Sequence, residues 1–300
     1  MRPSSHAKKA SREGRLSLNH KASDERFVRA TYEAQDRERA QPLRRGRFGT
    51  PAAEQLRRKE MRFLVTWHDK FEVIDLSQEI YEGMPVFGMH QKTFIMVNQT
   101  HEKNQEDTGS PTLGFAARNI LMSEHGPTHS DAVWEYLPGG ATIEKMPLEF
   151  FWGDAVCLDV SHIRYPEYIE PGDIEEALVK ASLDVRKGDI VLFHTGHYDR
   201  TYGTKAWYGP YTGVSRAAAE WLAQKGVVNI GVDQQAIDQT PDDLEFSGHH
   251  VCGKYGITNT ENLCNLDRVA GTRFLYMGLP LKIRDGSGSP VRATAFVAKD

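Results

Sequence analysis

Cysteine is scarce in this sequence and shows no pairing pattern. The 300 residues include three cysteines, Cys157, Cys252 and Cys264, and none of them lies in a Cys-x-x-Cys pair. An odd number without short spacing favours neither a disulfide framework nor a zinc knuckle. We therefore expect a reducing, cytoplasmic setting.

Long apolar runs are also missing. No stretch approaches the roughly 20 apolar residues that a membrane-spanning helix needs, and no basic-then-apolar signal sequence opens the chain. The sequence therefore predicts no membrane partner.

Charge is unevenly distributed along the chain. Residues 1–60 hold 16 Lys and Arg against 8 Asp and Glu, whereas the other 240 residues hold 21 against 33. The first segment lacks the apolar pattern of a chain that can bury a core. We predict a basic, disordered extension over 1–60 and a globular domain over 61–300, beginning at Met61. The acidic domain argues against a nucleic-acid partner, because affinity for phosphate depends on neutralising its charge.

The globular part consists of short apolar runs between turn residues, together with two amphipathic segments. Helices are expected over 171–182 and 215–226, the second with Ser215 as N-cap and Gly226 at its C-terminal end. The polar residues 98–112 predict a long loop, and 115–122 fits a strand or a helix equally well. Expected strands are 71–76, 93–97, 154–160, 189–194, 227–232, 274–281 and 294–298. Strands outnumber helices and only partly alternate with them, which indicates a mixed α/β domain.

One short segment concentrates metal-binding side chains. His125, His129 and Asp131 lie within seven residues, and divalent transition metals prefer such mixed nitrogen and oxygen ligands. Gly126 and Pro127 exclude a helix, so we expect a loop that curls until the three side chains converge. On these residues alone, two unrelated surface or capping histidines remain an alternative.

A second group of candidate ligands follows much later in the chain. Gly248, His249 and His250 stand together, and Glu261 follows His249 by twelve residues. A glutamate here could equally cap a helix or be a solvated charge. The spacing by itself leaves the role of this group open.

The order of these motifs resembles the cyclase family, which includes bacterial kynurenine formamidases and isatin hydrolase. The resemblance runs from about Asp75 to the end of the chain. It rests on DLSQEIYEGMPVF, HGPTHSD, DIVLFHTG, GVDQQAIDQ and GHHVCGKYGITNTENLCNLD. It implies a swivelling β/β/α domain with a mixed sheet, a small-molecule substrate and a homo-oligomer, dimer or tetramer.

The resemblance also implies a site. By position, one ion would be held by His125, His129 and Asp131, and a second by Asp131 with His249 and Glu261. It therefore implies one or two divalent ions per subunit, zinc or manganese. Phe87 stands where formamidases place an aromatic side chain against the substrate.

The chain departs from the family pattern just after Asp131. The formamidase signature continues through a Pro to a proton-transferring His, and here Val133 and Glu135 occupy these places. A glutamate beside a metal-activated water can do the same acid–base work, so we predict Glu135 as the catalytic residue. Trp134 is a candidate to complete the apolar wall with Phe87, although it could equally be core.

The sequence thus predicts a metal-dependent hydrolase that cleaves a non-peptide amide bond of a small aromatic or cyclic substrate. A lactone or cyclic-imide hydrolase of the isatin type is the alternative. Because the family's proton-transferring His is missing, a non-catalytic metal-binding protein is the alternative of another class. His194 and His197 are expected to be structural histidines.

Overall fold

The computed structural model describes residues 69–112 and 114–299. The predicted extension over 1–60 and the predicted start of the domain at Met61 lie outside these residues. Within the described ranges, no helix is both long enough and apolar enough to cross a bilayer.

The described part of the chain combines many short strands with a few helices. The strands are β1 Phe71–Asp75, β2 Phe94–Gln99, β3 Ala117–Leu121, β4 His129–Asp131, β5 Trp152–Asp159, β6 Ile190–His194, β7 Asn229–Val232, β8 Thr258–Glu261, β9 Thr272–Met277, β10 Gly288–Pro290 and β11 Thr294–Ala298. The α-helices are α3 His101–Thr108, α4 Pro171–Ala181, α5 His197–Thr201, α6 Arg216–Lys225 and α7 Ser247–Tyr255. Short 3-10 helices are η1 Val133–Glu135, η2 Ile143–Lys145, η3 Leu148–Phe150, η4 Lys205–Tyr208 and η5 Leu266–Arg268.

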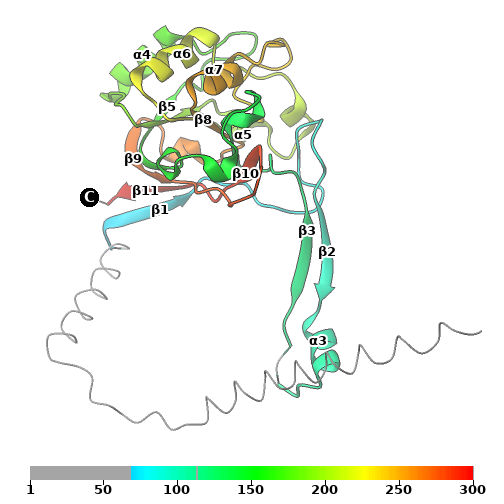
Figure 1. Cartoon of the computed structure of the whole chain (residues 1–300). Coiled ribbons are helices and arrows are strands. Elements are labelled where there is room, and N and C mark those ends of the chain that lie inside the picture. Colours follow the sequence, from blue (N-terminus) through cyan, green and yellow to red (C-terminus); the bar gives the residue numbers. More distant parts are fainter. Residues whose placement is uncertain (1–68, 113, 300) are drawn as a thin grey trace, which may run out of the picture. The chain divides into compact units, whose positions relative to one another are not determined.

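A nine-stranded mixed sheet organises the domain. Its order is β1-β11-β9-β5-β6-β7-β8-β4-β10. The central strands β5, β6, β7 and β8 are parallel, and antiparallel strands flank them on both sides. The prediction of a mixed α/β domain is confirmed (Figure 1).

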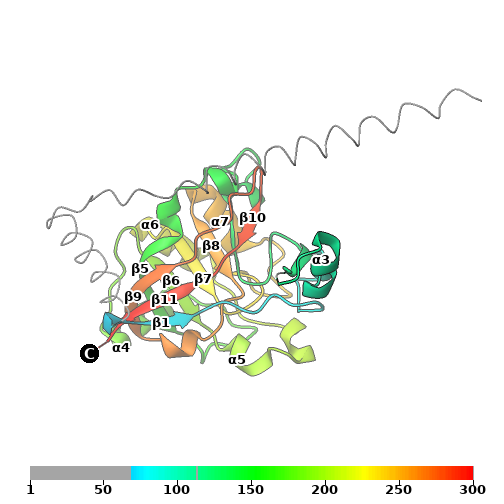
Figure 2. The same cartoon turned by 90° about the horizontal axis from the view of Figure 1, so that it is seen from below.

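Both faces of the central strands are buried, which explains why these strands read as continuous apolar runs. On β5, Val156 and Leu158 belong to a core shared with α4 and α6, whereas Ala155 and Cys157 belong to a second core. The second core includes Tyr276 of β9 and side chains of β1 and β11. Helices α4, α6 and α7 therefore cover one face of the central strands. Strands β1, β9 and β11 enclose the other face (Figures 1 and 2).

Two helix predictions are confirmed, and one loop prediction is wrong. The Ser215 side chain accepts a hydrogen bond from the backbone N–H of Ala218, and Gly226 ends α6 with a φ of 84°. Residues 98–112 contain α3 instead of a continuous loop. Thr100 caps this helix by accepting from the N–H of Lys103, and Gly109 ends it at a φ of 66°. Local capping thus forms a helix that the lack of apolar periodicity had concealed.

Strands β2 and β3 form a separate two-stranded ribbon that carries α3 between them (Figure 1). The segment 115–122, which fitted a strand or a helix, supplies β3. The ribbon pairs Phe94 with Leu121 and Ile95 with Ile120, and directly opposed residues share a face, so apolar side chains lie on both faces. We call this ribbon the arm.

His197 begins α5 and is buried against Trp207, whose backbone carbonyl oxygen lies 3.3 Å from its Nε2. Burial lowers the pKa of His197 to about 4, from an ordinary 6.5. Because the folded value is depressed, the unfolded chain binds a proton first, and stability falls as the pH drops from about 6.5 towards 4. We expect this group to remove about 2 kcal/mol of unfolding free energy between pH 7.5 and pH 5.

The measurement is urea unfolding of the wild type and of His197→Phe at these two pH values. The phenylalanine keeps an aromatic ring in the same space but cannot take up a proton. The variant should therefore lose less stability at pH 5 than the wild type. An identical loss in both proteins would contradict a neutral, buried His197.

Candidate metal centre

Strand register brings the two predicted groups of ligands together. In the antiparallel pair β4–β8, His129 stands directly opposite Glu261. Opposed residues share a face, and so do residues two apart on one strand. Asp131 therefore lies on the same face as His129 and Glu261. The expected curled loop is short, because β4 itself carries His129 and Asp131, and only His125 comes from the loop.

His249 reaches the same place from the first turn of α7. Asp238 holds this turn, since its Oδ1 accepts hydrogen bonds from the N–H groups of Gly248 and His249. A carboxylate at this position also opposes the positive end of the helix dipole. The second carboxylate oxygen of Asp238 contacts His249 Nδ1. Asp238 thus sets both the start of the helix and the direction of the imidazole.

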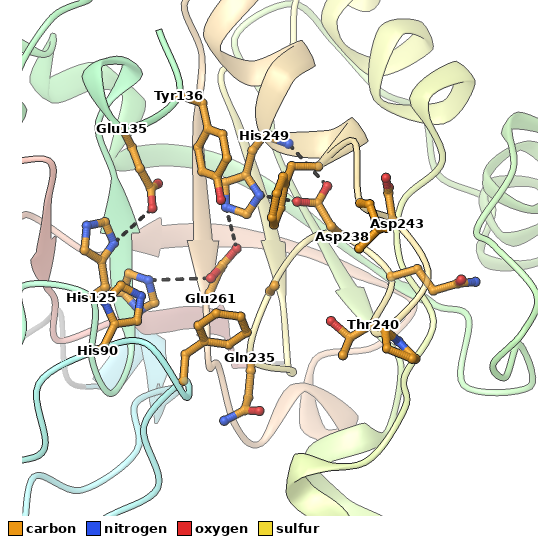
Figure 3. A pocket seen from close by; sticks show the side chains of 17 residues that line it. His90, His125, Glu135, Tyr136, Gln235, Asp238, Thr240, Asp243, His249 and Glu261 are labelled. Atoms are coloured by element: carbon orange, nitrogen blue, oxygen red, sulfur yellow. Dashed lines mark hydrogen bonds and ion pairs between the residues drawn. The ribbon is translucent and has the colours of Figure 1, made fainter. Parts of the chain in front are cut away.

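The five predicted metal ligands lie close together and are buried. Asp131 Oδ1 lies 2.7 Å from His125 Nδ1 and 3.3 Å from His129 Nε2. Asp131 Oδ2 lies 3.5 Å from His249 Nε2, and Glu261 Oε1 lies 3.1 Å from the same nitrogen. Glu261 Oε2 is 3.5 Å from His129 Nε2. Figure 3 shows His249, Glu261 and Glu135 converging from different elements.

Each imidazole is held by its outer nitrogen. His129 Nδ1 donates to the carbonyl oxygen of Pro127, and His249 Nδ1 donates to Asp238. His125 Nε2 lies 2.7 Å from Ser287 Oγ, which in turn donates to Glu124. Outer hydrogen bonds of this kind fix the tautomer of metal-binding histidines.

The inner nitrogens consequently face the carboxylates of Asp131 and Glu261 with their lone pairs. Lone pairs opposite carboxylates repel one another unless a proton or a cation lies between them. Without a cation a proton takes this place: Asp131 raises the pKa of His125 and of His129 against the effect of burial, and the protonated imidazoles hold the pKa of Asp131 well below its usual range. The donor set therefore fits a divalent cation, with nitrogen and oxygen ligands suited to zinc or manganese.

Glu135 lies beside this group, at the end of the 3-10 helix η1. Its Oε1 is 3.5 Å from His125 Nδ1, and its buried Oε2 has no hydrogen-bond partner. Burial, together with the charge of Asp131, raises the pKa of Glu135 to about 10. Asp131, Glu135 and His249 also form a group whose ligand atoms could share one ion.

A pocket of about 260 Å³ opens over the metal centre. The predicted Phe87 lines it, but the predicted Trp134 does not and is 43% exposed. Tyr136 and Phe246 supply the aromatic wall instead, and Tyr136 stacks on His249 with ring centroids 4.3 Å apart. None of the 17 residues that line the pocket is Lys or Arg.

Sequence reasoning missed several of these side chains. Asp238 lies in the GVDQQAIDQ segment, where its short distance along the chain from His249 was an available signal. His90 follows Phe87 by one turn and stacks on His125 with centroids 5.1 Å apart. Its imidazole and its place beside the MPVF segment could have suggested a pocket residue.

Another histidine and acid group lies where β6 and β7 end and α5 begins. His194, Asp199 and Asp233 are close enough to share an ion, and His194 Nε2 lies 2.9 Å from Asp199. Asp233, however, accepts hydrogen bonds from the N–H groups of Thr195 and Gly196. Its carboxylate is therefore used in joining these two strand ends, and a structural role for His194 stays a prediction.

Comparisons with known proteins agree with this arrangement. Residues 74–239, more than half of the chain, match the family model described as "Putative cyclase". A kynurenine formamidase of Erythrobacter litoralis is 27% identical over 234 residues, covering 76% of this chain and 95% of that protein. The kynurenine formamidase of Paracidovorax citrulli is 30% identical, covering 73% and 94%.

Solved structures with the same fold are also found. An isatin hydrolase bound to the product analogue thioisatinate superposes with a TM-score of 0.70 at 20% identity, covering 81% of this chain and 99% of that one. A potential metal-dependent hydrolase with cyclase activity superposes with a TM-score of 0.59 at 26% identity, covering 77% and 100%. The chain therefore belongs to the cyclase family, and it is a metal-dependent hydrolase.

Proposed function

We propose that this protein hydrolyses a non-peptide amide bond of a small aromatic or cyclic substrate, as the kynurenine formamidases among its relatives do. The chain acts on C–N bonds other than peptide bonds. The observation that carries the proposal is the set of three tethered imidazoles, His125, His129 and His249, whose free nitrogens face two shared carboxylates at the base of an aromatic pocket.

Different residues of this chain would bind the ions and transfer the proton. His125, His129 and Asp131 would hold one ion, and Asp131, His249 and Glu261 a second. When bound, the cation supplies a Lewis acid, a water of lowered pKa and the positive charge that returns Glu135 to its carboxylate form. Glu135 accepts a proton on its unpartnered Oε2 and later delivers it to the leaving nitrogen.

The pocket selects the substrate by shape and charge. Phe87, Tyr136 and Phe246 offer ring faces on which a planar substrate can stack. Since no Lys or Arg is among the described residues that line the pocket, these residues offer no basic partner for a substrate carboxylate. We therefore place aromatic amides without net charge ahead of anionic ones. The first two substrates to test are isatin, which is neutral, and N-formylkynurenine, whose carboxylate is balanced by its own ammonium group.

The fold is equally compatible with opening a cyclic amide, because an isatin hydrolase shares it. The test measures bound metal by elemental analysis, together with hydrolysis of N-formylkynurenine and of isatin by the metal-loaded protein. Cleavage of either substrate supports the proposal. Cleavage of N-formylkynurenine indicates an open-chain amide as the substrate, and cleavage of isatin indicates a cyclic amide. A protein that binds metal but cleaves neither these substrates nor other aromatic amides and lactones would instead be a non-catalytic metal-binding protein.

A second copy of this chain is the partner that we propose. The arm exposes large apolar side chains on both faces, each at least 44% accessible: Phe94, Met96, Val97, Ile120 and Leu121. An isolated two-stranded ribbon is marginally stable in water, and exposed apolar patches of this kind mark contact surfaces. The arm also joins the pocket directly, because His90 precedes β2 and His125 follows β3.

Light scattering of the purified protein should give a mass of two or four chains. The double variant Val97→Glu, Ile120→Glu places charges on one face of the arm and should reduce the mass to that of one chain. A wild-type protein that is monomeric at micromolar concentration would contradict this partner. For the cellular setting we propose the cytoplasm, supported by three unpaired, buried cysteines.

A further inference from the structure

Asn259 lies inside the metal centre, although neither its residue type nor the family resemblance pointed to it. It stands two residues before Glu261 on β8, and residues two apart on a strand share a face. The register that opposes His129 to Glu261 places Asn259 opposite Asp131 one step further along. Only 2% of Asn259 is exposed.

The carboxamide of Asn259 contacts all three residues proposed for the second ion. Its Nδ2 lies 2.6 Å from Asp131 Oδ2, 3.0 Å from Glu261 Oε1 and 3.3 Å from His249 Nε2. Those atoms are themselves close, with His249 Nε2 at 3.1 Å from Glu261 Oε1 and 3.5 Å from Asp131 Oδ2.

The two distances from His249 Nε2, 3.3 Å to Asn259 Nδ2 and 3.5 Å to Asp131 Oδ2, are in the range of ligand atoms around one cation, and the other contacts, at 2.6, 3.0 and 3.1 Å, are hydrogen-bond distances. Ligand atoms about 2.0–2.2 Å from a tetrahedral ion lie about 3.3–3.6 Å from one another. The terminal atom of Asn259 contacts all three of the other donor atoms, so a small displacement of these groups places it at the fourth corner of the same small polyhedron.

The chemistry of the amide tells which atom would face an ion. The N–H groups of Asn259 donate to two carboxylates, which is favourable while only carboxylates and an imidazole surround them. A cation between those groups repels N–H and attracts the carbonyl oxygen. The terminal torsion of an asparagine is broad and nearly two-fold, so a half-turn exchanges Nδ2 and Oδ1 at little steric cost.

We propose that Asn259 is a fourth protein ligand of the second ion, binding through Oδ1. This inference rests on the two-ion site of the proposed function. The second position then has three oxygen ligands, from Asp131, Glu261 and Asn259, and one nitrogen from His249. The first position has two nitrogens and one oxygen. Because oxygen donors suit manganese better than nitrogen donors do, the second position should show the greater preference for Mn²⁺ over Zn²⁺.

The test titrates the metal-free, full-length protein with Mn²⁺ and with Zn²⁺, and follows bound ions by elemental analysis and calorimetry. Wild type should bind two ions per chain. Asn259→Leu removes the donor at similar volume and should weaken the second ion by about 10–100-fold, leaving the first unchanged. Asn259→Asp keeps an oxygen at the same place and should bind both ions. Since these readouts are stoichiometry and affinity, they do not depend on finding the substrate.

Three results would overturn the inference. The Leu variant could bind both ions as tightly as wild type or more tightly, which would make the Asn259 amide a substitute for the ion and not its ligand. Wild type could bind a single ion at saturation, which would remove the second site while leaving the proposed hydrolase intact. Wild type could bind no ion at all, and only that result would also overturn the proposed function. If Asn259→Leu fails to fold, Asn259→Asp decides alone, because loss of its second ion contradicts an oxygen ligand at this position.

Discussion

The His129→Ala variant is expected to lose bound metal and hydrolytic activity together. His129 Nε2 is within 3.5 Å of both Asp131 and Glu261, so it faces both proposed ions. Removing groups that merely support a ligand costs about 10–100-fold in metal affinity, and removing the ligand itself should cost more. We expect metal affinity to fall by at least about 100-fold and turnover to fall in proportion. Elemental analysis and a rate assay on the same preparation measure both quantities.

A matched control variant distinguishes the loss of a metal ligand from the loss of any other histidine. His162 is exposed and lies outside the centre, so His162→Ala should keep wild-type metal content and rate. Circular dichroism must show that His129→Ala is folded, because the variant removes one partner from each of two buried carboxylates, Asp131 and Glu261. Full metal occupancy in folded His129→Ala would refute the assignment of this residue as a ligand.

The Glu135→Gln variant is expected to bind metal normally and to turn over about 10²–10⁴-fold more slowly. The amide keeps the shape of Glu135 but cannot take a proton from water. Its Oε2 is buried without a partner in a centre whose other donors are all engaged, which is the condition of a group that awaits a water or a substrate. The measurement is kcat at saturating metal, with metal content determined in parallel.

Two further variants make this result specific. Glu149 is exposed, and Glu149→Gln should retain the wild-type rate. Glu135→His restores the side chain that formamidases carry at this place and should recover part of the lost turnover, because an imidazole can also transfer the proton. Wild-type activity in Glu135→Gln would refute the role as base. Simultaneous loss of metal would identify Glu135 as a ligand instead, which its grouping with Asp131 and His249 allows.

Much of the fold could be predicted where local chemistry and tertiary packing agree. Helix α6 begins and ends at the residues that its capping side chain and its glycine indicate, because these interactions are made within one turn. Strand β6 is identified by an apolar run because both of its faces are buried. Helix α3 was missed for the opposite reason, since it buries little and depends on its caps.

The composition of the candidate centre followed from the sequence in part. His125, His129 and Asp131 were visible because they are adjacent, and His249 and Glu261 because their spacing matches a family pattern. Trp134 shows the limit of this reasoning. It adjoins Glu135 and is aromatic, yet the turn of η1 directs Tyr136 to the pocket and leaves Trp134 exposed.

By itself, the sequence determined the family, the mixed α/β class and the nitrogen and oxygen chemistry of the centre, because each is encoded in residue types at short spacings. Only the tertiary structure decided which groups surround those ligands. Asp238 meets His249 through the first turn of α7, and Asn259 meets Asp131 through the pairing of β8 with β4. Such contacts depend on strand register and helix placement, which arise from the packing of the whole domain, so spacing along the chain shows that two residues are near in sequence but not that their side chains meet.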